Sequence, residues 1–119
     1  MSAITETLRR IVGGREAAAT GPVQAVWNGA VVADSDRTVV VEGNHYFPPE
    51  DVESRHLEPS SHQTVCPWKG TASYYHVVIE DERNRNAAWY YRNPSSAAAQ
   101  IKDYIAFWHG VKVKPAERT

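Results

Sequence analysis

Apolar and polar residues alternate with a period of two along much of this chain, a pattern typical of β-strands. In residues 71–79 the even-numbered positions lie on one face of the predicted strand and the odd-numbered positions on the other. The polar run 80–86 then predicts a hairpin loop, and the apolar run 87–91 predicts the returning strand. The segment from 71 to 91 is therefore expected to form a β-hairpin.

A second hairpin is predicted nearer the N-terminus. Two apolar runs, 23–27 and 30–33, flank the dipeptide Asn28-Gly29, which two-residue hairpin turns favour. Residues 38–42 are almost entirely β-branched and predict a further strand. The first half of the domain is thus expected to be built from short antiparallel strands.

The middle of the chain shows weaker periodicity. A short strand is expected at 45–47, and acidic residues after two prolines predict one helical turn over 50–55. Residues 58–70 have no period and contain two prolines and a glycine, so they predict an irregular loop. Loops held by a rigid scaffold often carry binding or catalytic residues.

Near the C-terminus the period changes to that of a helix. Ile101, Tyr104, Ile105 and Trp108 are spaced at i, i+3, i+4 and i+7, which places them on one stripe of a helix. Gly110 is expected to end that helix. An apolar stripe must be buried, so the helix is predicted to pack on the sheet.

The organised domain is predicted to span residues 23–114. Residues 1–22 are interpreted as an N-terminal appendage or linker, with a helical turn or two over 1–12. Valine and lysine alternate over 111–114 and predict an edge strand whose lysines discourage further pairing. Residues 115–119 are expected to form a tail.

Together these elements predict a mainly β fold of the β-rich α+β class. The expected architecture is a compact single domain of antiparallel hairpins, which could close in a barrel-like manner, with one C-terminal helix packed on the sheet. A length of 119 residues leaves room for one domain, and a hydrophobic fraction of 42% is enough for a folded core.

The charge and the cysteine content indicate which binding partners and which cellular compartment to expect. The formal net charge is −1, so no bulk electrostatic attraction draws the protein to nucleic acid or to an anionic membrane. The apolar stretches are far shorter than a membrane-spanning helix needs. A single cysteine, Cys66, cannot form an intramolecular disulfide, which favours the reducing cytoplasm.

The segment Cys66-Pro67-Trp68-Lys69-Gly70 is the main candidate for chemistry. The proline and glycine restrict and shape the backbone, so that this loop would present Cys66 and Lys69 in fixed positions. A thiolate beside a lysine is a conceivable nucleophile. The more common role of a free cysteine in a β-rich domain is that of a small buried residue. Lys69 could instead hold a phosphate or a carboxylate.

Other side chains suggest metal chemistry less strongly. His45, His56 and His62 could approach Cys66, but their spacings match no zinc pattern. The residues therefore predict no metal site and identify no cofactor. Acidic residues at the predicted turns are accounted for by turn and helix-cap chemistry without magnesium.

The chain is also rich in aromatic residues, several of which can line a pocket or an interface. We expect a ligand pocket whose walls are Tyr46, Trp68, Tyr74 and Trp89. Lys69 and Arg55 would neutralise an anionic ligand, and Cys66 and His45 would line the floor.

Several motifs appear in a fixed order along the domain. They are Ala33-Asp34-Ser35, Tyr46-Phe47-Pro48-Pro49-Glu50-Asp51-Val52, Leu57-Glu58-Pro59-Ser60, Cys66-Pro67-Trp68-Lys69-Gly70 with Ala72 and Tyr74-Tyr75, Ala87-Ala88-Trp89, and the C-terminal Ile101, Tyr104 and Phe107. With these motifs the chain resembles the domain of unknown function 427 family, which is also catalogued as nucleotidyltransferase-like. The resemblance covers roughly residues 23–113 and implies a compact, mainly β domain with a C-terminal helix.

Three functions remain open from the sequence. The leading hypothesis is the binding of a small anionic ligand around the loop at residues 66–70. The family label suggests a magnesium-dependent nucleotidyltransferase, with Asp34 or Asp51 on the metal and Lys69 on the phosphates, although no such catalytic motif is evident. The third is a non-catalytic module in which the aromatic residues form the seam of a homodimer. The candidate catalytic residues are Cys66 and Lys69.

Overall fold

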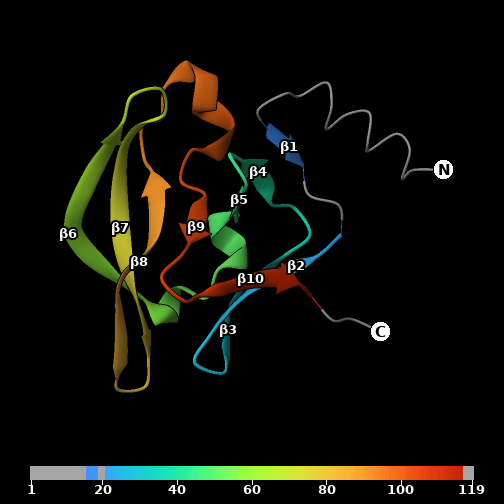
Figure 1. The fold of residues 1–119 in the computed structure, drawn as a ribbon, viewed down its shortest axis with the longest axis vertical. Coiled ribbons are helices and arrows are strands. Elements are labelled where there is room, and N and C mark those ends of the chain that lie inside the picture. Colours follow the sequence, from blue (N-terminus) through green and yellow to red (C-terminus); the bar gives the residue numbers. More distant parts are fainter. Residues whose placement is uncertain (1–15, 19–20, 117–119) are drawn as a thin grey trace.

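The structure, a computed structural model, describes residues 16–18 and 21–116. The described part of the chain consists of ten strands and three short 3-10 turns (Figure 1). In chain order they are β1 (Glu16–Ala18), β2 (Val23–Trp27), β3 (Ala30–Ser35), β4 (Val39–Val41), β5 (Asn44–Tyr46), η1 (Pro49–Asp51), η2 (Ser54–His56), β6 (Leu57–Cys66), β7 (Gly70–Ile79), β8 (Glu82–Tyr91), η3 (Ser96–Ile101), β9 (Ile105–Phe107) and β10 (Lys112–Pro115). The predicted mainly β fold is confirmed.

The strands form three antiparallel sheets. Their strand orders are β1-β4-β5, β10-β2-β3 and β6-β7-β8-β9. Single bridges, such as those joining Ala33 to Val52 and Phe47 to Ile105, link neighbouring segments. Such single bridges do not make a continuous ladder around the molecule, so the expectation of barrel-like closure is wrong.

Both predicted hairpins are confirmed. β2 and β3 are joined through Asn28 and Gly29, whose φ angles are 54° and 79°. Positive φ at both turn residues matches the twist of the flanking strands, which explains why this dipeptide is used. β7 and β8 form the second and longer hairpin, but its loop is only residues 80 and 81: the predicted loop over 80–86 is too long, because residues 82–86 belong to β8.

The predicted alternation along the 71–79 strand changes phase halfway. Ala72 and Tyr74 are buried at even positions, whereas Val77 and Ile79 are buried at odd positions. The pairing of β7 with β8 shifts register between Tyr75 and Val77. Between the pairs Tyr75–Ala88 and Val77–Asn84, one residue of β7 lies opposite three residues of β8, and the inward face of β7 changes at this irregularity.

Residues 58–70 are more regular than their sequence predicts. Residues 57–66 form β6, which pairs with β7 along the outer edge of the four-stranded sheet (Figure 1). Residues 61–65 are all exposed, so no apolar period marks the strand, and the register shifts between Pro59 and Gln63. The expectation of an irregular loop is wrong for this physical reason.

The predicted C-terminal helix is also wrong. Residues 96–101 form the 3-10 turn η3, Asp103 adopts a φ of 64°, and Ile105–Phe107 extend as β9 against β8. The open edge of β8 offers backbone partners and a buried position for every residue of β9. Tertiary pairing therefore overrides the helical spacing of the apolar residues.

The two ends of the domain add edge strands. β10 pairs with β2 at the edge of its sheet, as the alternating valines and lysines predict. Residues 16–18 pair with β4 as β1, although the sequence suggests a linker there. The helical turns expected over residues 1–12 lie outside the described residues. No helix in the described part of the chain is long and apolar enough to cross a membrane.

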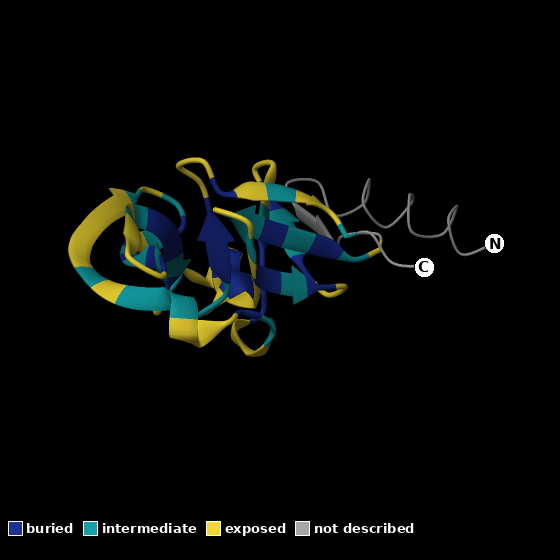
Figure 2. Cartoon of the chain, turned by 90° about the horizontal axis from the view of Figure 1, so that it is seen from below, coloured by how far each residue is buried: buried dark blue, intermediate teal, exposed yellow. Residues whose placement is uncertain are grey.

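The buried residues form two clusters, which appear as the dark central band of Figure 2. The apolar cluster contains Val23, Ala25, Val32, Ala33, Phe47, Val52, Val77, Ile79, Ala87, Ala88, Ile105, Phe107 and Val111. The aromatic cluster contains Val41, Tyr46, Ala72, Tyr74, Trp89, Tyr91, Ala98, Ile101 and Ala106. β8 and β9 separate the two clusters, because the cross-strand pair Trp89 and Ala106 belongs to one and the pair Ala88 and Phe107 to the other.

Candidate functional site

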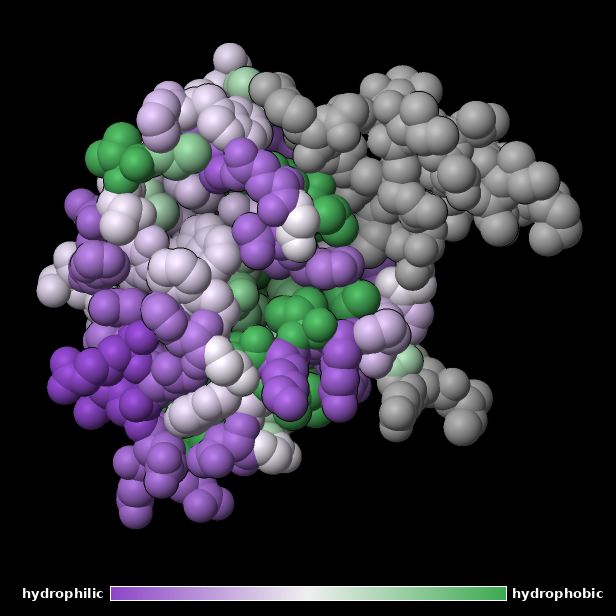
Figure 3. All heavy atoms as spheres, in the orientation of Figure 1, coloured by the Kyte–Doolittle hydropathy of each residue, from purple (hydrophilic) through white to green (hydrophobic). Residues whose placement is uncertain are grey.

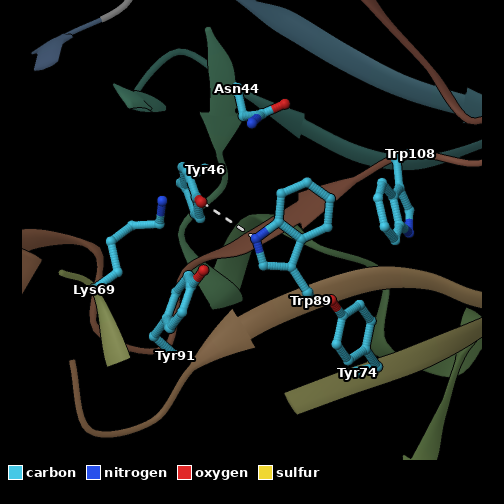
Figure 4. Close-up of a pocket in the computed structure, with 7 residues that line it drawn as sticks. All are labelled: Asn44, Tyr46, Lys69, Tyr74, Trp89, Tyr91 and Trp108. Atoms are coloured by element: carbon cyan, nitrogen blue, oxygen red, sulfur yellow. Dashed lines mark hydrogen bonds between the residues drawn. The ribbon is translucent and has the colours of Figure 1, made fainter. Parts of the chain in front are cut away.

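A pocket of about 150 Å³ opens beside the aromatic cluster. Its lining residues are Asn44, Tyr46, Lys69, Tyr74, Trp89, Tyr91 and Trp108. They come from β5, the loop before β7, β7, β8 and the residue that follows β9. Lys69 lies at one end of the pocket and Trp108 at the other, with Trp89 between them (Figure 4). The pocket thus has a polar end and an aromatic end.

The polar end is built around the ammonium group of Lys69. Only 5% of this residue is exposed, and its Nζ forms an ion pair with the carboxylate of Glu42. Trp68 Nε1 donates a hydrogen bond of 3.0 Å to the other carboxylate oxygen of Glu42. Lys69 Nζ also lies 4.8 Å from the ring centre of Trp68 and 5.8 Å from that of Tyr91. Two aromatic rings and one carboxylate therefore stabilise a buried positive charge.

The protonation state of Lys69 follows from these neighbours. Burial is the largest single effect and acts to lower the pKa of Lys69, but the hydrogen bond with Glu42 and the charges of Tyr46, Cys66 and Glu42 together outweigh it, so the pKa is raised above its ordinary value. Lys69 is therefore a cation at neutral pH. The pocket consequently has a charged hydrogen-bond donor at its polar end.

Two tyrosine hydroxyls lie next to this ammonium group. Trp89 Nε1 donates a hydrogen bond of 3.2 Å to the Tyr46 hydroxyl oxygen, shown as the dashed line in Figure 4. The Tyr91 hydroxyl points into the space between Lys69 and Trp89 (Figure 4). Burial raises the pKa of both tyrosines, so both hydroxyls stay protonated and able to donate.

The aromatic end is a set of rings in mutual contact. The ring centres of Trp89 and Trp108 are 5.3 Å apart in an edge-to-face arrangement, and those of Tyr74 and Trp108 are 6.3 Å apart in a stacked one. Trp108 Nε1 donates a 2.6 Å hydrogen bond to the carbonyl oxygen of Asn86, which orients the indole. Trp108 is 44% exposed, so it forms the outer wall of the pocket.

Local backbone contacts hold the 66–70 loop in place. The backbone N–H of Ser95 donates to the carbonyl oxygen of Lys69 at 2.9 Å, and Ser95 Oγ donates to that of Trp68 at 2.6 Å. Gly70 has a φ of 121°, and a Cβ atom there would lie 3.4 Å from the carbonyl oxygen of Asn93. Only glycine adopts this conformation easily so close to another backbone. These contacts bind the loop to the segment that follows β8, and they hold the backbone of Lys69 in a fixed position.

Cys66 lies beside the polar end but does not line the pocket. Burial acts to raise the pKa of its thiol, but hydrogen bonds from the backbone N–H groups of Lys69 and Trp68, together with the charge of Lys69, lower it overall. The residue is partly exposed and is not in a disulfide. Cys66 is therefore more acidic than an ordinary thiol.

The structure brings together half of the residues predicted for the pocket. Tyr46, Lys69, Tyr74 and Trp89 line it, while Cys66 and Trp68 pack against the same cluster from the loop. The remaining two predicted residues, His45 and Arg55, have other partners.

His45 and Arg55 face away from this site. His45 Nδ1 lies 2.9 Å from Thr38 Oγ1, on the opposite side of β5 from Tyr46. Arg55 is an exposed residue of η2, and its Nε lies 3.6 Å from Glu53 Oε1. Because successive side chains of a strand point to opposite faces, His45 and Tyr46 cannot both face the pocket. The period of two in the sequence is enough to predict this.

Four residues of the site were not predicted for it: Glu42, Asn44, Tyr91 and Trp108. Asn44 and Tyr91 lie two positions from Tyr46 and Trp89 on the same strands, so the period of two marks them as neighbours on the same face. The spacing of the apolar residues places Trp108 on a helix, which does not form. Glu42 carries no local signal, because its contact with Lys69 joins positions 27 residues apart.

The carboxylates considered for magnesium line a different pocket from Lys69. Asp34 and Asp51 lie with Glu50 and Glu53 beside β3 and η1. Asp51 accepts a hydrogen bond of 2.6 Å from Ser35 Oγ, and Arg37 binds the same carboxylate. The structure thus separates the acids from the lysine that a nucleotidyl-transfer site would need together.

The histidines considered for metal binding are engaged separately. His56 Nδ1 lies 3.2 Å from the carbonyl oxygen of Val78, and the ring of His62 lies 4.7 Å from that of Tyr74. Among the described residues, no three or more histidine, cysteine, aspartate or glutamate side chains are placed to hold a metal ion.

A search of curated proteins finds no significant match. A family model, in contrast, matches residues 16–117, which includes all ten strands and every residue of the pocket. The chain therefore belongs to the family described as Domain of unknown function (DUF427), whose model is named NTP_transf_9.

Proposed function

We propose that this protein binds a small anionic ligand in the pocket between Lys69 and Trp108. One observation carries the proposal: Lys69 is only 5% exposed and lines a pocket walled by aromatic rings. Small-molecule sites commonly combine apolar walls with a few converging polar groups. A charged donor at one end of such a pocket favours a ligand that carries an oxyanion.

A purely structural role explains this lysine poorly. Removing an ammonium group from water costs several kcal/mol, and a buried ion pair often stabilises a fold no better than apolar residues would. Glu42 satisfies part of the charge, yet its side chain is 49% exposed. A buried lysine with a half-exposed partner is better explained by a binding site in which a ligand anion replaces the carboxylate of Glu42.

The two other functions have less support from the geometry. Nucleotidyl transfer would need Asp34 or Asp51 close to Lys69, and those carboxylates line a separate pocket. A homodimer seam of aromatic residues would need several of them exposed together, whereas Trp108 is the only aromatic among the exposed large hydrophobic residues that the structure describes. On the face drawn in Figure 3, hydrophobic residues lie among hydrophilic ones. We also favour a cytoplasmic setting, because Cys66 is a free and acidic thiol.

The proposal can be tested with ligand-observed NMR on a panel of small carboxylates, phosphates, amides and quaternary ammonium ions. We expect anions to bind and cations not to bind. In Lys69→Met the anions should lose binding, whereas the control Lys102→Met should keep it, because Lys102 is exposed and pairs with Asp103 away from the pocket. Equal binding of anions to wild type and Lys69→Met would contradict the proposal.

A further inference from the structure

We infer that the ligand is an aromatic carboxylate with a single ring, whose carboxylate replaces that of Glu42 on Lys69. This inference rests on the proposed function and makes it more specific. The ring would lie against Trp89 and Trp108, and the carboxylate would lie among the donors at the polar end. Three features of the pocket support this class of ligand: its volume, its set of donors and the carboxylate already present.

The volume of the pocket leaves room for one ring inside it. The pocket holds about 150 Å³. An apolar cavity of about that volume in another protein accommodates one benzene molecule. Aromatic walls prefer another flat ring, because offset-stacked and edge-to-face contacts are both favourable. A nucleotide, with a base, a sugar and phosphates, would place only one of these groups inside this space.

The donors at the polar end match a carboxylate. The Tyr91 hydroxyl belongs to a residue that is only 4% exposed and points into the pocket. Within the part of the chain that the structure describes, no hydrogen bond satisfies this hydroxyl. The Tyr46 hydroxyl accepts from Trp89, which leaves its own proton for another acceptor. Together with Lys69 Nζ, these hydroxyls offer three donors to the two oxygens of a carboxylate.

Glu42 shows which group Lys69 recognises. Its carboxylate binds Lys69 Nζ through one oxygen and Trp68 Nε1 through the other. Glu42 lies in the short turn between β4 and β5, and its half-exposed side chain can be hydrated outside the pocket. A ligand carboxylate that takes its place keeps the buried ammonium paired. The exchange therefore avoids an uncompensated buried charge.

The same polar end disfavours cations, although aromatic rings surround it. The ammonium of Lys69 already lies over the rings of Trp68 and Tyr91. A ligand cation would meet this charge at close range in a site shielded from water. The aromatic rings therefore do not form a cage for a quaternary ammonium group.

Isothermal titration calorimetry on the full chain tests the class with four probes. They are benzoate, benzamide, acetate and benzyltrimethylammonium. We expect benzoate to bind at least about tenfold more tightly than benzamide, which lacks the charge that strengthens the hydrogen bonds. Acetate should bind at least about tenfold more weakly than benzoate, because it lacks the ring. Benzyltrimethylammonium should not bind.

Each contrary result has a separate meaning. If acetate binds as tightly as benzoate, the single-ring class is wrong and the proposed anion site stands. If benzamide binds as tightly as benzoate, or if benzyltrimethylammonium binds, both the inference and the proposed function are wrong. If none of the four probes binds, the inference is wrong, and the anion panel described above decides the proposed function.

Two variants test the exchange itself. Glu42→Gln removes the competing charge, so we expect benzoate affinity to rise about tenfold while benzamide affinity stays unchanged. Tyr91→Phe should weaken benzoate about tenfold, whereas the neighbouring control Tyr90→Phe, on the other face of β8, should not. A fall in benzoate affinity in Glu42→Gln, or equal affinities in the two tyrosine variants, would overturn the inference.

Discussion

The apolar cluster and the aromatic cluster lie on opposite faces of the same strands and are built differently. On β8, Ala88 faces the apolar cluster and Trp89 faces the aromatic cluster. The apolar cluster is closed by aliphatic side chains and by the edge-to-face pair of Phe47 and Phe107, whose ring centres are 5.6 Å apart. The aromatic cluster borders a pocket and a buried lysine.

This difference follows from the chemistry of the side chains. Aliphatic groups and phenylalanine rings have no polar atoms and pack to high density. Tyrosine and tryptophan carry polar groups that need partners or open space, so a cluster of them cannot close as completely. Here the hydroxyls of Tyr46 and Tyr91 lie between Lys69 and Trp89. One face of the strands therefore forms a closed core, and the other borders the pocket.

The largest expected effect is a loss of stability in the apolar cluster. Phe47 is fully buried, so Phe47→Ala should lower the free energy of unfolding by about 3–5 kcal/mol. Tyr91→Phe, in the aromatic cluster, should leave it nearly unchanged, because the lost hydroxyl has no partner among the described residues. Urea denaturation measures both variants. Similar losses in the two variants would show that the clusters do not differ in this way.

A smaller effect should distinguish the two partners of the ion pair in the pocket. Glu42→Gln leaves the buried ammonium of Lys69 without its counter-charge, so it should cost about 1–3 kcal/mol of stability. Lys69→Met should cost less, because the half-exposed Glu42 regains water and the methionine fills the space of the lysine chain. Thermal unfolding at pH 7 measures the order of the two. The reverse order would indicate that the ion pair acts mainly as a structural contact.

A pH effect should come from the other side of β5. Burial lowers the pKa of His45 below its ordinary value, so the folded protein resists a proton that the unfolded chain accepts. The contribution of His45 to the free energy of unfolding is therefore fully present above pH 6.5, the ordinary pKa of histidine. It is lost as the pH falls toward the lowered pKa of His45 in the folded protein. Melting temperatures measured from pH 7 to pH 5 should fall less steeply in His45→Gln than in wild type. Parallel curves would exclude His45 as a cause.

The smallest effect is expected at an exposed ion pair. Arg83 binds both oxygens of Glu58, at 2.7 and 3.0 Å, on the outer surface of the sheet. Exposed pairs contribute little because water and salt screen them. Arg83→Ala should therefore leave the melting temperature nearly unchanged and should not alter ligand binding. If Arg83→Ala lowered the stability as much as Glu42→Gln does, the exposed ion pair and the ion pair at the pocket would not differ in their contribution to stability.

Several features of the fold and the site were predictable from short stretches of sequence. Asn28-Gly29 predicts its hairpin, because both residues tolerate positive φ. The period of two predicts β7 and β8, and it also groups Asn44 with Tyr46 and Tyr91 with Trp89. The restricted backbone of the 66–70 loop points to Lys69. Each of these inferences depends on local backbone preferences, which neighbouring residues determine.

Other features were decided by contacts between distant segments. Residues 105–107 have helical spacing but form β9, because β8 offers an open edge. The exposed β6 strand has no apolar period, and it is held by its pairing with β7. Glu42 reaches Lys69 across 27 positions of the chain. Local sequence determined the hairpins and the faces of their strands, whereas only tertiary packing decided which edges pair and which charge accompanies Lys69, because these depend on free energies shared between segments far apart in sequence.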